Sequence, residues 1–336
     1  MKTYEIQEFG IDKLAFVDRD TPEPGANEVL VKMQAASLNY RDVMVVSGTY
    51  NPRMKMPAIP FSDGAGEVVA VGEGVTKWKI GDRVCSTVIP GWADGEPTAQ
   101  KAKSAIGAGT FDGVLREYVA FGQESIVSVP VHLSFEEAAT LPCAAVTAWN
   151  ALVVSGKIKA GDTVLTLGTG GVSIFALQIA KHLGARVIST SSSDEKLEKV
   201  RRLGPDETIN YRTREDWDRA VLELTDGVGV DHVVEIGGTG TLTRSVKSVR
   251  VGGHIALIGG LNMTGEFNPV PIFMKGIRMQ GIFVGSREMF ENLNKTIESA
   301  KLTPVVDRVF AFDQVPEALN YMADGSHFGK IGIKIS

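Results

Sequence analysis

The chain has 336 residues, 43% hydrophobic and 22% charged, which is ordinary for a globular protein of about two domains. Its net charge of −5, without a basic cluster, argues against nucleic acid or an anionic membrane as partner. The opening MKTYEIQEFG lacks a signal-peptide pattern, and no apolar run approaches the roughly 20 residues of a membrane helix. The two cysteines, Cys85 and Cys143, suit a reducing compartment, so we expect a cytoplasmic protein.

The first ~125 residues predict a β-rich domain. The stretches ANEVLVKMQAASL (26–38) and AGEVVAVGEGV (65–75) alternate apolar and polar residues as half-buried strands do. KIGDRV (79–84) predicts a turn that feeds another strand. Residues 90–112 are polar and glycine-rich, which indicates a long loop of the kind that is either functional or mobile. Strand character returns at 112–121.

The pattern changes near residue 134, where Ser134 and Glu137 have the spacing of a helix capping box. Val/Ile-rich runs then alternate with amphipathic helices, which predicts a doubly wound parallel sheet. From about 267 the alternation stops, so we expect the tail to return to the first domain. The predicted organisation is a β-rich catalytic domain at 1–129 and 267–336 and a dinucleotide-binding domain at 130–266. The predicted strands of the second domain are 163–168, 186–191, 207–211, 231–237 and 254–260, and its helices are 172–184, 194–204, 215–224 and 241–249.

The sequence GTGGVS (168–173) lies between a predicted strand and a predicted helix, which is the context of a dinucleotide-binding turn. Gly168 would make the turn, and Gly170, Gly171 and Val172 would bring the helix N-terminus to a pyrophosphate. Ser173 replaces the third glycine of the usual fingerprint and is small enough for close packing. The alternative is a purely structural strand-to-helix turn.

The next strand predicts which nucleotide binds. NAD-binding versions carry an acidic residue about 20 residues on, but here the strand ends in Ser191, Ser192 and Ser193. These hydroxyls, Lys196 and Tyr211 favour the 2′-phosphate of NADPH. Alternatively the serines cap the following helix and Lys196 is a solvated charge, and the nearby Asp194 argues against a phosphate.

Several stretches in order, including GAGEVVAVGEGVTKWKIGDRV (64–84), the glycine turn, LIGG (257–260) and GKIGIKI (329–335), resemble the medium-chain dehydrogenase/reductase superfamily. The resemblance implies a GroES-like β domain joined to a Rossmann domain. In the metal-dependent branch, zinc binds a cysteine, a Gly-His-Glu histidine and a third residue. Here Asn39 and Phe61-Ser62-Asp63 stand at the first two places and only Cys143 remains, so we expect no metal.

Asn39-Tyr40-Arg41-Asp42 resembles the zinc-independent, quinone-oxidoreductase-like branch. That resemblance implies that Asn39 contacts the nicotinamide ribose and that the protein is a homodimer joined through a Rossmann edge strand near 254–260 or 278–284. It implies further cofactor contacts from Thr147, Gly259, Gly260, Leu261, the backbone of Phe283 and Val284, and Lys330.

Hydride transfer to a carbonyl builds negative charge on oxygen, which zinc would offset. Without zinc, a quinone or an α,β-unsaturated carbonyl is the favoured small-molecule substrate because conjugation spreads the charge. Tyr40 is the candidate proton or hydrogen-bond donor, and the adjacent Asn39 is the second candidate catalytic residue. Tyr40, Tyr50, Trp92 and Phe283 are candidates for an aromatic pocket. The alternatives are a metal-free alcohol or aldehyde oxidoreductase and a nucleotide-binding scaffold without turnover.

Overall fold

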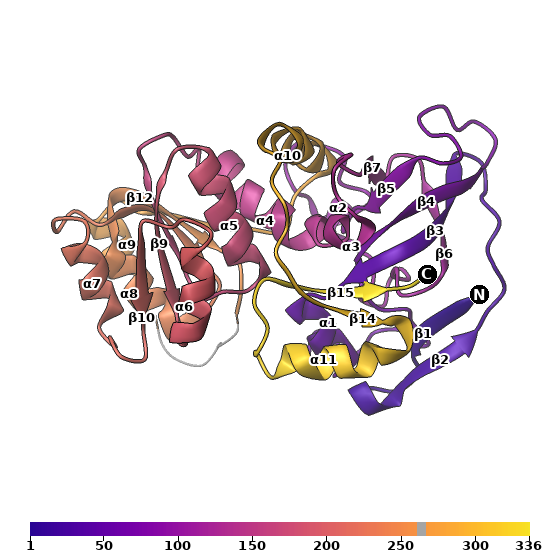
Figure 1. Cartoon of the computed structure of the whole chain (residues 1–336), viewed down its shortest axis with the longest axis horizontal. Helices are drawn as coiled ribbons and strands as arrows, with labels where there is room; N and C mark the ends of the chain where they lie inside the picture. The colour runs from indigo at the N-terminus through magenta and orange to yellow at the C-terminus, as the bar shows by residue number, and fades with distance from the viewer. Residues whose placement is uncertain (261–266) are drawn as a thin grey trace. The chain divides into compact units, whose positions relative to one another are not determined.

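The computed structural model describes residues 1–260 and 267–336, which form two compact units (Figure 1). Unit 1 comprises Met1–Val146 and Val284–Ser336, and unit 2 comprises Thr147–Phe283. The tail therefore returns to the first unit, but the boundaries lie later than 129/130 and 266/267. The first shift arises because the helix that begins at Phe135 packs on the strands of unit 1, and the second because residues 278–281 add a strand to the sheet of unit 2.

Unit 1 is built on a seven-stranded sheet with the order β14-β15-β3-β4-β5-β7, and β6 also pairs with β3, counting only described residues. A separate two-stranded sheet joins β1 and β2. The strands are β1 (Lys2–Ile6), β2 (Leu14–Asp18), β3 (Glu28–Ser37), β4 (Asp63–Val71), β5 (Arg83–Ser86), β6 (Tyr118–Gly122), β7 (Ile126–Ser128), β14 (Val306–Ala311) and β15 (Lys330–Lys334).

Helices of unit 1 are short except for one near the C-terminal return. They are α1 (Tyr40–Val46), α2 (Ala99–Ala102), α3 (Phe135–Ala138), α10 (Arg287–Ala300) and α11 (Val315–Ala323), with the 3₁₀ turns η1 (Ile11–Lys13) and η4 (Phe312–Gln314) and the π-helical turn η2 (Leu141–Ala145). The capping box of Ser134 and Glu137 at the start of α3 is confirmed, since each accepts from the other's backbone N–H.

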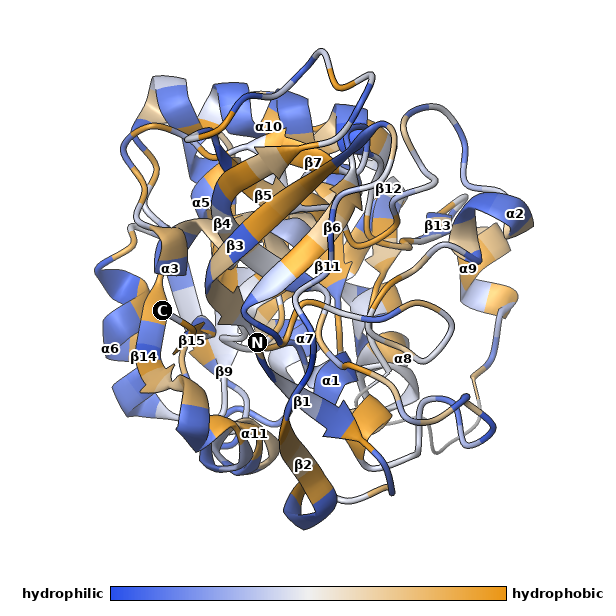
Figure 2. Cartoon of the chain, turned by 90° about the vertical axis from the view of Figure 1, so that its right-hand side faces the viewer, coloured by the Kyte–Doolittle hydropathy of each residue, from blue (hydrophilic) through white to orange (hydrophobic). Residues whose placement is uncertain are grey.

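The register of three strands brings distant parts of unit 1 together. Ser37 at the end of β3 pairs with Asp63 at the start of β4 and also with Gly332 in β15. Apolar residues of β3, β4 and β5 contribute to the core of unit 1, and these strands carry hydrophobic segments coloured orange in Figure 2. The pairing of β3 with β4 and with β15 therefore brings residues 39, 63 and 330 side by side.

Unit 2 is a six-stranded parallel sheet with the order β10-β9-β8-β11-β12-β13 in the described chain. Numbered within the unit, this is the 3-2-1-4-5-6 order of the Rossmann fold, so the predicted fold class is confirmed. The elements are β8 (Thr163–Thr166), β9 (Arg186–Ser191), β10 (Glu207–Asn210), β11 (Val230–Glu235), β12 (Val249–Leu257), β13 (Arg278–Gly281), α4 (Val146–Trp149), η3 (Asn150–Ser155), α5 (Gly171–His182), α6 (Asp194–Arg201), α7 (Trp217–Glu223), α8 (Thr239–Ser248) and α9 (Val270–Met274).

Of the two candidate edge strands, only one lies at an edge. β12 is paired on both sides, with β11 and β13, so the stretch 254–260 is not an edge. Among the described strands, β13 pairs with β12 alone and ends the sheet.

One helical segment of the described chain, Phe135–Ser155, is long and apolar enough by composition to span a membrane. However, 78% of its most apolar stretch is buried inside the protein. A mostly buried helix of this kind is the core helix of a folded domain.

Candidate functional site

The glycine turn of unit 2 is open where a ligand would approach it. Gly168 has φ +70°, a conformation that favours glycine after β8. Gly170 is the N-cap of the 12-residue helix α5 and provides no side-chain cap. A Cβ at Gly170 would meet no atom within 4 Å. The first N–H groups of α5, which include those of Gly171 and Val172, are therefore suited to an anion at the helix N-terminus.

Ser173 explains how the turn tolerates the missing third glycine. Its side chain is 1% exposed, and its hydroxyl donates a 2.6 Å hydrogen bond to the carbonyl of Leu167. The serine thus ties the first turn of α5 to Leu167, the residue that follows β8.

A cavity of about 140 Å³ adjoins this turn at the carboxyl ends of the strands. Ligands of doubly wound sheets bind at this edge. Gly168 and Tyr211, both predicted cofactor residues, line it. Its other walls are Leu167, Thr190, Trp217, Ile236, Gly237 and Thr241.

The three serines at the end of β9 and directly after it differ in accessibility and in their contacts. Ser191 is 2% exposed, and its Oγ accepts a hydrogen bond from the N–H of Ser193 at 3.3 Å. Ser193 caps α6 by accepting from the N–H of Lys196, so the capping interpretation holds for this serine. Ser192 and the Lys196 side chain are half-buried. Ser192 and Lys196 are therefore better placed than Ser191 to contact a phosphate.

Glu235 is a feature of the site that our sequence reasoning missed. Its carboxylate is fully buried at the end of β11 and accepts hydrogen bonds from the N–H of Gly237 at 2.7 Å and of Gly238 at 3.2 Å. The hydroxyl groups of Thr241, at 2.6 Å, and Ser245 also donate to it. The sequence does carry a signal for it, because an acidic residue ends an apolar strand shortly before Gly237 and Gly238. This network fixes the loop that lines the cavity.

The remaining predicted cofactor residues of unit 2 differ in how exposed they are to solvent. A Cβ on Gly259 would meet the carbonyl oxygen of Ile236 at 2.4 Å, so glycine is required there for packing. Gly260 and Phe283 are exposed, whereas Thr147 is 3% exposed. Leu261 lies outside the described residues.

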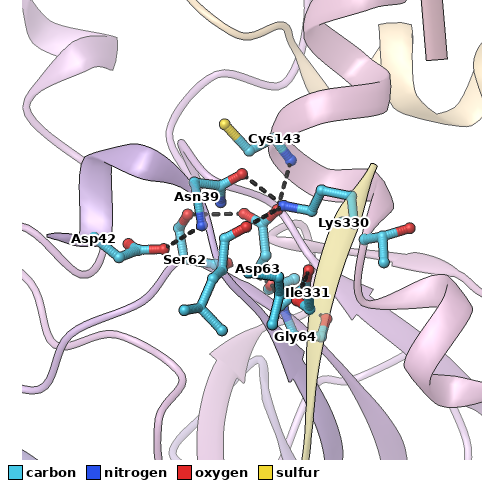
Figure 3. Close-up of polar contacts among 12 residues, drawn as sticks. Asn39, Asp42, Ser62, Asp63, Gly64, Cys143, Lys330 and Ile331 are labelled. Atoms are coloured by element: carbon cyan, nitrogen blue, oxygen red, sulfur yellow. Dashed lines mark hydrogen bonds and ion pairs between the residues drawn. The ribbon is translucent and has the colours of Figure 1, made fainter. Parts of the chain in front are cut away.

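Unit 1 contains a polar cluster made from β3, α1, β4 and β15, with Asn39, Asp63 and Lys330 at its centre (Figure 3). Asn39 is the N-cap of α1, and its N–H donates to Asp42 Oδ2 at 2.8 Å. The capping box directs Asp42 inward, where it is fully buried. Burial is the main cause that raises the pKa of Asp42 to about 6.

Asp63 is positioned by an unusual backbone segment. The preceding Phe61 is fully buried and has φ +70°, a strained conformation for a residue with a side chain. Asp63 Oδ1 accepts from the hydroxyl of Ser62 at 2.8 Å, and Oδ2 accepts from the N–H of Cys143 at 3.1 Å.

Lys330 of β15 reaches into this cluster. Its Nζ donates to the carbonyl of Leu38 at 2.5 Å and to Asn39 Oδ1 at 2.7 Å, and lies 3.7 Å from Asp63 Oδ2. The residue is 2% exposed. Asn39 and Lys330, which the sequence indicated separately as cofactor contacts, are therefore in direct contact, and the ammonium group is buried.

These residues do not fit a zinc ion. Asn39 Oδ1 already accepts a hydrogen bond from an ammonium group, and the Ser62 hydroxyl donates to Asp63, so neither oxygen is free for a metal ion. A second cation beside Lys330 would be repelled. Among the described residues, no group of three His, Cys, Asp or Glu side chains could hold a metal.

One residue of the expected aromatic pocket, Trp92, is buried in the protein core instead. Trp92 is 2% exposed, packs with Val88 and Ile89, and donates its ring N–H to the carbonyl of Gly95 at 2.8 Å. It is a core residue because its ring fills a small hydrophobic cluster. Tyr40 and Tyr50 are 45% and 44% exposed and remain available.

The segment 90–112 is more ordered than a long loop. It contains the short helix α2, and Lys101 Nζ donates to the carbonyls of Asp94 and Glu96. Arg41 donates to the carbonyl of Ile106 at 3.0 Å and lies 6.0 Å from the ring centre of Tyr50. The guanidinium group of Arg41 thus ties the segment to α1.

Two family models match the chain. Residues 25–131 match the alcohol dehydrogenase GroES-like domain, and residues 171–299 match the zinc-binding dehydrogenase model.

Similar proteins align over nearly the whole chain. A zinc-type alcohol dehydrogenase-like protein of Schizosaccharomyces pombe is 44% identical, over 97% of this chain and 96% of its own. The 2-methylene-furan-3-one reductase of Solanum lycopersicum is 33% identical, over 99% of this chain and 79% of its own length. The crystal structure of an NAD-dependent alcohol dehydrogenase is 33% identical, with a TM-score of 0.92 over 100% of both chains. The predicted family resemblance is thereby confirmed.

Proposed function

Because the chain belongs to the medium-chain dehydrogenase/reductase superfamily, an NAD(P)H-dependent oxidoreductase family, we propose that it is an NADPH-dependent, metal-free reductase of quinones or α,β-unsaturated carbonyls. The observation that carries this proposal is the set of contacts around Lys330. The buried ammonium group stands among the residues at the metal-ligand places of the zinc-dependent branch.

The nucleotide is assigned to unit 2. The N–H groups at the start of α5 hold the pyrophosphate beside Gly170, and the neighbouring cavity accepts the adenine ring. Ser192 and Lys196 hold the 2′-phosphate, which distinguishes NADPH from NADH. When bound, NADPH supplies the hydride.

The substrate class follows from the charge that the reaction produces. A hydride added to a simple ketone leaves a localised alkoxide, which needs a metal or several aimed donors. Addition to an enone or quinone leaves an enolate or quinol anion, whose charge is delocalised. A site with the amide of Asn39 and the hydroxyl of Tyr40 as donors is sufficient for the second reaction, and the 2-methylene-furan-3-one reductase relative supports this class.

A zinc-independent alcohol or aldehyde dehydrogenase is the second candidate, since two of the similar proteins are named as alcohol dehydrogenases or alcohol dehydrogenase-like. Initial rates with menadione, a simple enone, a simple ketone and an aldehyde, with EDTA present throughout, separate the two. We expect reduction of menadione or the enone with NADPH. Turnover of only the ketone or aldehyde would support the second candidate, and NADPH binding without any turnover would support a scaffold.

We also propose a cytoplasmic homodimer. The sheet edge at β13 is unpaired among the described strands, and α9 leads into it with Phe273 and Met274 exposed at 68% and 71%. An apolar surface beside an open sheet edge is suited to pairing with a second copy. The free cysteines Cys85 and Cys143 are consistent with a reducing compartment.

A further inference from the structure

Lys330 is an unusual residue to find in the interior of unit 1. Its ammonium group has three donors and is almost removed from solvent, and such burial destabilises a charge unless it is paired. The pairing here is incomplete as an ion pair, because Asp63 Oδ2 is 3.7 Å away and also accepts from the N–H of Cys143. The shorter contacts go to neutral oxygens, those of Leu38 and Asn39.

The contact with Asn39 fixes which way its carboxamide faces. An ammonium group only donates hydrogen bonds, so the atom facing it at 2.7 Å must be the amide oxygen. The NH₂ group consequently faces away from Lys330, and rotation of the amide would set two donors against each other.

The NH₂ group of Asn39 has no acceptor. Asn39 Nδ2 is buried and forms no hydrogen bond within the described parts of the chain. A buried donor without a partner costs stability, and native proteins rarely retain one without a reason. An acceptor oxygen supplied by a bound ligand would provide that reason.

We propose that Lys330 is a positioning residue that aims and polarises the Asn39 amide toward a ligand oxygen, and that its charge replaces the metal ion of the zinc-dependent branch. This inference rests on the proposed function, since the oxygen is that of the carbonyl acceptor, which gains negative charge as hydride arrives. Withdrawal of electron density through Oδ1 makes the Nδ2 protons better donors to such an oxygen. Asp63 limits the positive charge and anchors it.

The test compares Lys330→Met, which removes the charge at similar length, with Lys330→Met/Asp63→Asn, which removes both charges. Lys334→Met is the matched control, because Lys334 is an exposed lysine of the same strand. We measure kcat and KM for the best acceptor of the wild type, NADPH affinity by fluorescence, and thermal unfolding. In the ligand-free protein, NMR records the side-chain amide protons of Asn39, assigned by their loss in Asn39→Ala.

We expect Lys330→Met to lower kcat about 10- to 100-fold, the range for a lost charge-assisted contact, with a smaller change in NADPH affinity. The Asn39 amide protons should shift upfield. The double variant should regain thermal stability without regaining kcat, and Lys334→Met should match the wild type.

Recovery of kcat to within twofold in the double variant would overturn the proposal, because the lysine would then only neutralise Asp63. Unchanged Asn39 resonances in Lys330→Met would also overturn it. If the wild type bound no NADPH or reduced no acceptor, the proposed function would fail, yet the NMR comparison would still test the polarisation of Asn39.

Discussion

The side-chain amide of Asn210 donates a 2.7 Å hydrogen bond to Asp194 Oδ1, which joins the end of β10 to the first residue of α6. The carboxylate is exposed, and it lies two residues after Ser192, the serine assigned to the 2′-phosphate. Its negative charge therefore opposes the phosphate, while Asn210 holds it beside β10.

Asp194→Asn should consequently tighten NADPH binding about 3- to 10-fold, as expected for removal of a nearby like charge. NADH binding should change less than twofold. Fluorescence titration with both nucleotides checks this, with Glu195→Gln as the control at the neighbouring exposed acid. Equal changes for both nucleotides would place the phosphate elsewhere.

Lys196→Ala should weaken NADPH binding by about 10-fold or more, which corresponds to the loss of a charge-assisted contact of about 1.4 kcal/mol or more. NADH, which lacks the 2′-phosphate, should be affected much less. The same titrations measure the ratio, and Lys199→Ala on the same helix is the control. A parallel loss for both nucleotides contradicts the assignment to NADPH.

Glu235→Gln should destabilise unit 2 and weaken nucleotide binding. The substitution leaves one acceptor oxygen and introduces an NH₂ group among N–H and hydroxyl donors, so two donors would face each other. We expect a loss of about 1–3 kcal/mol in the free energy of unfolding. Denaturant titration measures it, and Thr241→Val, which removes a single donor, should lose less. A Glu235→Gln protein as stable as the wild type would show that the network is not important for the fold.

The free energy of unfolding should decrease as the pH is lowered, over a range that the pKa of His254 determines. Burial, and secondarily the neighbouring His232, lower the pKa of His254 to about 4, below its ordinary value of 6.5. The unfolded chain therefore binds a proton more readily than the folded one, so stability is complete above about pH 6.5 and declines as pH falls toward 4. The loss is at most about 3 kcal/mol.

His254→Gln should flatten this decline, because the pH-dependent difference in proton binding is removed. Urea unfolding at pH 7.0 and 5.0 checks the slope, and the exposed His182→Gln is the control. If the variant lost as much stability as the wild type between pH 7.0 and 5.0, the prediction would be wrong.

Phe273→Glu/Met274→Lys should convert a dimer to a monomer, since the two side chains form the exposed apolar part of α9 next to the β13 edge. Analytical ultracentrifugation measures the mass of both proteins. Replacement of Val251, which is also exposed, by Lys is the control. A wild type that sediments as a monomer, or a variant that stays dimeric, contradicts the proposed interface.

Much of this protein was readable from the sequence by itself. Alternating Val/Ile runs and helices predicted the parallel sheet, the glycines after β8 predicted the turn, and Ser134 and Glu137 predicted a helix start. These features depend on neighbours in the chain, through backbone conformation, capping and periodic burial. The sequence also indicated Asn39 and Lys330 separately.

Only the tertiary structure decided what those residues do to each other. Asn39 and Lys330 are 291 positions apart, and the pairing of β3 with β4 and β15 brings them to 2.7 Å. The same holds for Trp92, whose burial depends on distant partners, and for Glu235, whose charge is tolerated because four donors converge on it. Strand register and packing link residues that are far apart in the chain, and no local pattern encodes the hydrogen bonds that result.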